Sequence, residues 1–230
     1  MSASSLKAAQ LKAVHRMLAF NDESAVSAYG DGSFGGSGSG SGGGGGGEYN
    51  LPPAGSSHNQ WKILIYDAAC RSIISPILSV KELRRRGVTL HLLLSSEREP
   101  IPDVPAVYFC RPTRENLAII ARDCERGLYQ RAHLNFVTKL DRALMEDFAK
   151  LVVQSSSLDV IASVHDQYLD YVCLEQRLFS LHKVNSYADI NGSGATEQVI
   201  EQAMTDIAYG LFSVVASLGL IPVIRCPRVS

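Results

Sequence analysis

The sequence predicts an α/β fold: one open five-stranded parallel sheet flanked by helices, followed by the helical beginning of a second, truncated domain. Between residues 61 and 185, short apolar runs alternate with stretches of helical periodicity. Each apolar run is nearly continuous, which is typical of a parallel strand covered on both faces. With 230 residues, of which 46% are hydrophobic and 20% charged, the chain is long enough to bury such a core.

Five apolar runs are the expected strands of this sheet. They are residues 62–67, 88–94, 106–110, 133–137 and 160–164. Stretches long enough for helical crossovers separate most of them, and parallel strands need connections of that kind. The proline-rich loop over 100–105 leads directly into the third run. We therefore expect all five strands to lie in one sheet.

The predicted helices carry recognisable start and stop signals. Thr113 can cap a helix with apolar residues at Leu117, Ile120, Ala121, Cys124 and Leu128. Ser79 opens a capping box, and the Ser75-Pro76 pair places proline where a first helical turn tolerates it. Three arginines, 84–86, precede Gly87, and we interpret them as complementing the negative end of a helix dipole.

The first 60 residues divide into a helix and a linker. Residues 1–22 contain a helix that ends near Asn21, with one apolar face formed by Leu6, Leu11, Val14, Met17 and Leu18. Residues 23–60 are a Gly/Ser-rich insertion, expected to be flexible, and 12 of the 19 glycines lie between Gly30 and Gly47. Gly30–Gly35 matches the dinucleotide pattern G-x-G-x-x-G, but neither a strand nor a helix flanks it, so we reject a dinucleotide site.

The C-terminal part, residues 186–230, is expected to begin a second domain. The polar stretch 186–195 marks the boundary with the α/β domain over 61–185. A long helix follows, ending at about Leu218, and residues 220–224 have the composition of a further strand. Because that strand has no successor in the sequence, the chain is expected to be the first part of something longer.

Composition excludes several classes of protein. The net charge of −1 excludes a general binder of the nucleic-acid backbone, which would be strongly basic. No apolar stretch approaches the ~18–20 residues of a membrane span, so we expect no direct membrane insertion. Five cysteines without C-x-x-C spacing indicate a reducing compartment rather than a disulfide scaffold or a zinc site. The chain is therefore expected to be soluble and cytoplasmic.

The sequence contains no convincing catalytic, cofactor or metal site. The first strand runs into Ala68-Ala69 and the second into Ser95-Ser96, without the glycines that let a backbone approach phosphates. Asp67 is expected to cap the following helix. The histidines on or beside strands, His91, His133 and His165, are expected to be structural, and adjacency of Ser163, His165 and Asp166 does not assemble a triad.

Several stretches resemble the SM family (Sec-one/Munc-eighteen proteins), which bind SNAREs and regulate vesicle fusion. These stretches are WKILIYD at 61–67, IISP at 73–76, SVKELR at 79–84, VTLHLLL at 88–94 and PIPDVPAVYF at 100–109. DVPAVYF at 103–109, DQYL at 166–169 and IPVIRCPR at 221–228 are closer still to the Sly-one branch, which serves traffic between endoplasmic reticulum and Golgi. Family members continue for several hundred residues more, so the resemblance implies an N-terminal fragment.

The resemblance also implies a binding site. Domain one of the family carries a pocket for the N-terminal peptide of a syntaxin, on the helix after the fourth strand and at the start of the fifth. By position this corresponds to Met145, Phe148, Ala149 and Ile161. The first three are spaced i, i+3, i+4 and form an apolar stripe, although such stripes are more often core, and Phe148 could be core alone.

Two acidic residues beside this stripe, Glu146 and Asp147, could form a charged rim for basic residues of the peptide. The implied protein is a non-enzymatic binder of syntaxin-type SNAREs, and of SNARE complexes in its full-length form. It would be associated peripherally with ER and Golgi membranes through the SNAREs. The alternatives are a Rossmann-like nucleotide-binding enzyme and a non-functional truncated product.

Overall fold

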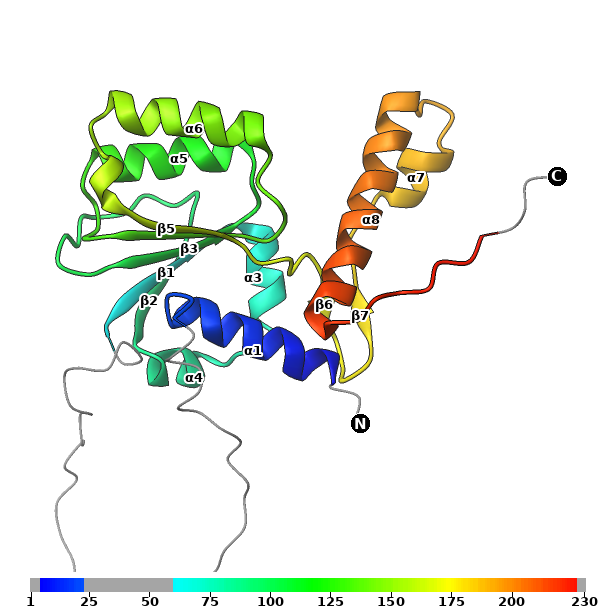
Figure 1. The fold of residues 1–230 in the computed structure, drawn as a ribbon, viewed down its shortest axis with the longest axis horizontal. Helices are drawn as coiled ribbons and strands as arrows, with labels where there is room; N and C mark the ends of the chain where they lie inside the picture. The colour runs from blue at the N-terminus through cyan, green and yellow to red at the C-terminus, as the bar shows by residue number, and fades with distance from the viewer. Residues whose placement is uncertain (1–4, 23–59, 227–230) are drawn as a thin grey trace, which may run out of the picture.

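The computed structural model describes residues 5–22 and 60–226, which form a parallel sheet layered between helices and a smaller helical unit beside it (Figure 1). The Gly/Ser-rich insertion predicted over 23–60 lies, apart from Gln60, outside the described residues. So does the Gly30–Gly35 motif, and nothing in the structure tests either prediction.

The predicted five-stranded parallel sheet is confirmed. Its strand order is β2-β1-β3-β4-β5, and every neighbouring pair runs parallel. The strands are β1 (Lys62–Tyr66), β2 (Val88–Leu93), β3 (Ala106–Cys110), β4 (Ala132–Phe136) and β5 (Ile161–Asp166). Every residue of β1 and β3 is buried, as their apolar composition predicts, whereas β2 and β5 form the two edges.

Helices cover both faces of the sheet (Figure 1). One face packs against α5 (Arg114–Glu125) and α6 (Arg142–Gln154), in a core that includes Ile65, Tyr108 and Leu134. The other face packs against α1 (Leu6–Leu18), α3 (Ala68–Ile74) and α4 (Val80–Arg85). The alternation of side chains along each strand divides the apolar residues between these two cores.

The predicted helix caps are present. The hydroxyl of Thr113 accepts a hydrogen bond from the Asn116 amide at 3.2 Å, and that of Ser79 accepts one from the Glu82 amide at 3.2 Å. Gly87 follows α4 with φ +80°, a left-handed conformation that favours glycine. The prediction that Pro76 lies in a first helical turn is wrong: α3 ends at Ile74, and Pro76 lies in the turn that follows it.

The second unit consists of a small hairpin and two helices. Its elements are β6 (Val172–Cys173), β7 (Phe179–Ser180), α7 (Ser186–Asn191) and α8 (Glu197–Leu218). The one-turn helix η1 (Leu158–Val160) belongs to the sheet domain, between α6 and β5. The expected strand over 220–224 is wrong, because these residues are irregular and Ile221 is 96% exposed. An apolar segment becomes a strand only beside a partner strand, and no described strand lies next to it.

Helix α8 also corrects the prediction about membrane spans. By length and composition it is the one described helix that could cross a membrane, since its charged residues concentrate toward its N-terminal end. Several of its large apolar side chains are exposed, namely Val199, Met204, Tyr209, Leu211 and Phe212. Length and composition alone are weak evidence, because core helices of globular proteins also meet this criterion.

Candidate functional site

Helix α6 presents an exposed apolar stripe on the side away from α5. Asp141 begins the helix by accepting a hydrogen bond from the Ala143 amide at 3.1 Å. Met145, Ala149 and Val153 follow at four-residue intervals and are all exposed, Val153 to 60%. Residues spaced in this way share one helix face, so the three side chains form a continuous surface.

Phe148 does not belong to this exposed stripe. It is only 6% exposed and belongs to the core between α6 and the sheet, with Val152 one turn later. The expected i, i+3, i+4 stripe is therefore divided: Met145 and Ala149 are exposed, and Phe148 supports them from beneath. The burial of Phe148 agrees with the alternative interpretation, in which it is a core residue. A lysine at this position would disturb the packing of the core before it affected any ligand.

Strand β5 contributes the neighbouring wall of the surface. Ile161 pairs with Ala132 of β4 and packs, half-buried, against the core beneath α6. The register then shifts, so that Val164 rather than Ser163 pairs with Leu134, a core residue on the α6 face. Val164 therefore lies on the same face as Ile161 and is 44% exposed.

We define the α6–β5 surface as Met145, Ala149, Val153, Ile161 and Val164, with Phe148 at its base. The predicted residues Met145, Phe148, Ala149 and Ile161 lie at this surface or at its base, and Val153 and Val164 were not among the predicted residues. Val153 continues the four-residue spacing and could have been found. Val164 could not, because simple alternation from Ile161 predicts Ser163 on this face, and only the bulge reverses the pattern.

The two predicted rim residues already have partners within the chain. Glu146 accepts a hydrogen bond from Arg142 at 2.9 Å, one turn earlier in α6. Asp147 pairs with Lys150 at 3.3 Å and with Arg114 of α5 at 2.9 Å. Hydrogen bonds from Lys150 and Arg114 lower the pKa of Asp147 below its ordinary value. A basic residue of a ligand would have to exchange with these cations.

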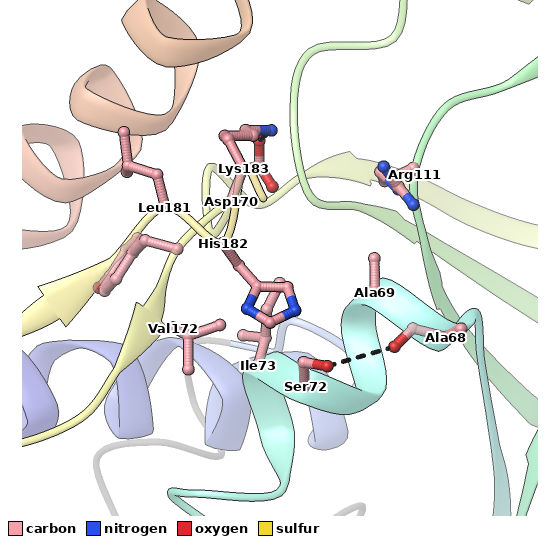
Figure 2. Close-up of a pocket in the computed structure, with 11 residues that line it drawn as sticks. Ala68, Ala69, Ser72, Ile73, Arg111, Asp170, Val172, Leu181, His182 and Lys183 are labelled. Atoms are coloured by element: carbon pink, nitrogen blue, oxygen red, sulfur yellow. Dashed lines mark hydrogen bonds and ion pairs between the residues drawn. The ribbon is translucent and has the colours of Figure 1, made fainter. Parts of the chain in front are cut away.

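A concave region lies where β1 and β3 end. A cavity of about 270 Å³ opens there between α3 and the β6–β7 hairpin (Figure 2). Its two cations each have a carboxylate nearby: Lys183 lies 2.9 Å from Asp170, and Arg111 lies 3.8 Å from Asp67. Because both cations are paired, the cavity gives little support to binding of a nucleotide phosphate.

Asp67, the acidic residue at the end of β1, has a structural role. One of its oxygens accepts a hydrogen bond from the Cys70 amide at 2.8 Å, which caps α3. The other accepts from the Arg111 amide at 2.9 Å and from the Asn116 side chain at 3.2 Å. These bonds tie the end of β1 to the segment after β3, as a helix cap and a loop anchor.

The candidate catalytic groups on β4 and β5 do not converge. Ser163 lies 3.0 Å from His133 and shares the α1 face of the sheet with His165, whereas Asp166 pairs with Phe136 on the opposite face. Asp166 accepts a hydrogen bond from the Leu140 amide at 3.0 Å. Within residues 5–22 and 60–226, no three His, Cys, Asp or Glu side chains gather into a potential metal site.

Comparison with known proteins identifies the family. The Sec1 family profile matches residues 62–230. The Arabidopsis thaliana SEC1 family transport protein SLY1 is 45% identical over 178 residues, which cover 77% of this chain and 28% of that protein. The chain belongs to the Sec1 family. The human Sec1 family domain-containing protein 1 is 44% identical, over 78% of this chain and 29% of its own length.

Solved structures of the Sec1 family have the same fold. Sly1p, crystallised in complex with an N-terminal peptide of Sed5p, matches 95% of this chain and 34% of its own with a TM-score of 0.77 and 33% identity. The Unc18–syntaxin 1 complex from Monosiga brevicollis matches with a TM-score of 0.68 at 22% identity, which supports the fold alone. The resemblance to SM proteins is thus confirmed. The chain spans less than a third of the length of the curated Sec1 relatives it matches.

Proposed function

We propose that the chain binds the N-terminal peptide of a syntaxin-type SNARE on the α6–β5 surface. The observation that carries the proposal is the 33% identity and shared fold with Sly1p, which was solved with an N-terminal peptide of Sed5p. The chain itself offers exposed apolar side chains on its sheet domain, on helix α6 and edge strand β5.

The chemistry of the surface favours a short peptide with an aliphatic or aromatic anchor. Met145 and Val153 stand on the helix, Val164 stands on the strand, and the buried ring of Phe148 closes the base. An anchor side chain would displace water from these apolar groups, a favourable process of roughly 25 cal/mol per Å² of apolar area. Met145 can adapt to anchors of different shapes because its side chain is unbranched and flexible.

The acidic rim adds selectivity more than affinity. Glu146 is 56% exposed and Asp147 41%, and both have intramolecular partners, so a pair with a peptide cation is exposed to solvent and contributes little to affinity. A basic residue next to the anchor would orient the peptide along α6. Affinity therefore depends mainly on the apolar side chains.

The wider role in this proposal is vesicle-mediated transport between ER and Golgi. The Sly1 names of the curated relatives support that route. The protein would act by binding rather than catalysis, in the cytoplasm, and would reach ER and Golgi membranes through its SNARE partner. Contact with assembled SNARE complexes would belong to a longer form of the protein, since Sly1p continues over about three times the matched length.

Calorimetry with a syntaxin N-terminal peptide tests this function. Met145→Arg places a charge on the exposed stripe and should weaken binding at least tenfold, or about 1.4 kcal/mol. Leu151→Arg is the matched control, because Leu151 is similarly exposed but lies one turn after Asp147, on the flank of α6 that pairs with Arg114 of α5. Equal affinity for the two variants, or no binding by the unmodified chain, would contradict the proposal.

A further inference from the structure

Helix α1 connects the sheet to the second unit. In Figure 1 it runs beneath the sheet, from the β6–β7 hairpin at one end to the lower edge of the sheet at the other. It packs against α8 and β6 as well as against the sheet core. Along the chain, the 43 residues from 19 to 61 separate α1 from β1. Non-covalent contacts hold the helix at both of its ends.

The sheet end of α1 is held by polar contacts. The ammonium of Lys62, fully buried in β1, donates to the carbonyl of Leu18 at 2.8 Å. The side-chain amide of Asn21 donates to Oδ1 of Asn135 on β4 at 2.9 Å. Gln167, directly after β5, donates to Oδ1 of Asn21 and to Oδ1 of Asn135. These bonds connect the C-terminal end of α1 to the strands of the sheet.

The opposite end of α1 is held by the second unit. The Leu6 amide donates to the carbonyl of Gln176 at 2.9 Å, and the buried side chain of Gln10 donates to the carbonyl of Tyr171 at 2.8 Å. Beneath this end lies Cys173 of β6, a thiol with no exposed surface. Cys173 shares one core with Leu6 of α1, and α1 packs against β6.

Several features oppose this docking. Phe20 has φ +59°, a strained conformation for a bulky side chain, whereas Asn21 at φ +60° is of a residue type that adopts this region readily. The side-chain oxygens of Gln10 and Gln167 are buried without a hydrogen-bond partner among the described residues. Burial of the Lys62 ammonium is a further cost. The docked helix thus combines good apolar packing with strain and unsatisfied polar groups.

We propose that α1 is a detachable clamp, which opens as one unit and uncovers the sides of β6 and α8 that it packs against while the sheet stays folded. The clamp has two anchored ends and a rigid helix between them, so loss of one end weakens the other. Because β6 also packs against α3, opening of α1 would loosen the second unit without releasing it from the sheet domain. Gln167 directly follows β5, so its hydrogen bonds also connect the clamp to the strand that carries Val164.

Thiol labelling of the complete chain tests the clamp. The protein is treated with N-ethylmaleimide under native conditions, and the modified cysteines are located by mass spectrometry. Cys173 reports opening of α1, and Cys124, on the buried side of α5, reports unfolding of the sheet domain. Asn21→Gly removes the amide contacts yet suits the positive φ, so it should fold. It should speed labelling of Cys173 about tenfold and leave Cys124 unchanged.

The control is Lys12→Ala, on the exposed face of α1, which should change neither rate. If Asn21→Gly leaves Cys173 unchanged, or speeds Cys173 and Cys124 equally, the clamp does not open as a unit and the proposal is wrong. Hydrogen exchange gives a second reading. The amides within α1 should share one opening free energy, below that of β3, and a gradual decrease toward one end would equally overturn the proposal.

Discussion

The ammonium of Lys62 donates a hydrogen bond to the backbone carbonyl of Leu18, which lies 44 residues earlier in the sequence, at 2.8 Å. The same ammonium lies 4.6 Å from the centre of the Phe20 ring. A fully buried lysine on an interior strand thus contacts the C-terminal end of a helix from a distant part of the chain, through a hydrogen bond and a cation–π contact. This contact explains why a charged residue is tolerated in the otherwise apolar run of β1.

Lys62 should give the protein a distinctive stability at alkaline pH. Burial, and secondly the nearby charge of Arg86, lowers the pKa of Lys62 from 10.5 to about 8. Between these values the unfolded chain binds more protons, so this group makes stability rise with pH, by at most about 1.4 kcal/mol per unit. Lys62→Met should remove this contribution. Urea unfolding of both proteins from pH 7 to 11 measures the difference, and parallel curves would contradict the assignment.

Two histidines should weaken the fold in mild acid. Burial lowers the pKa of His15 and of His133 to about 4, aided by Arg86 and Arg131 respectively. Since the unfolded chain protonates them near pH 6.5, stability should fall as pH drops from about 6.5 to 4, by up to about 1.4 kcal/mol per pH unit for each histidine.

The variant that checks this is His133→Gln, which keeps a polar partner for Ser163. Its unfolding free energy should depend less steeply on pH over the same window than that of the unmodified chain. An unchanged slope would mean that His133 is accessible and titrates normally in the folded protein.

A buried ion pair should be one of the most sensitive points of the sheet domain. Arg98 donates to both oxygens of Asp123, at 2.8 and 2.7 Å, and the hydroxyl of Tyr108 donates to the same carboxylate at 3.0 Å. Both charged side chains are only 4% exposed. Arg98→Met leaves the carboxylate buried without its cation and should destabilise the protein by about 3–5 kcal/mol.

The double variant Arg98→Met/Asp123→Leu separates a lost contact from a stranded charge. Replacing both partners should recover much of the stability lost in the single variant, because no unpaired charge remains. Chemical denaturation of the three proteins is the measurement. A double variant no more stable than Arg98→Met would show that the pair stabilises the protein through its packing, and that the unpaired charge of Asp123 is not the cause of the loss.

Nucleotides should not stabilise the chain. A bound ligand raises the melting temperature by mass action, so ATP, ADP, NAD and NADP at millimolar concentration would shift a thermal transition if any of them bound with micromolar affinity. With Arg111 and Lys183 both paired at the strand ends, we expect no shift. A reproducible increase with one nucleotide would instead support the Rossmann-like alternative.

The sequence predicted the parts of the structure that depend on local signals. Thr113 and Ser79 begin helices because each hydroxyl accepts a bond from an amide three residues away, a pattern visible in the sequence. The nearly continuous apolar runs of β1 and β3 predicted strands that are covered on both faces, and both strands are fully buried. A core on both faces of the sheet then follows from parallel connections covered by helices, whereas the strand order was not predicted.

Features that depend on distant contacts could not be predicted in this way. Val164 faces α6 only because the β4–β5 register shifts, which is a property of the pair rather than of either strand. Phe148 and Met145 are three residues apart, yet one is buried and one exposed, because the helix rotation on the sheet decides which flank is covered. Residues 220–224 have the composition of a strand but lack a neighbour.

Methyl NMR during titration with a syntaxin N-terminal peptide tests the central claim most directly. The account predicts that shifts concentrate at Met145, Val153, Ile161 and Val164, with small changes at Leu151 and on α8. Shifts that cluster instead around the cavity between α3 and the β6–β7 hairpin, or no shifts at saturating peptide, would contradict the assignment of the α6–β5 surface.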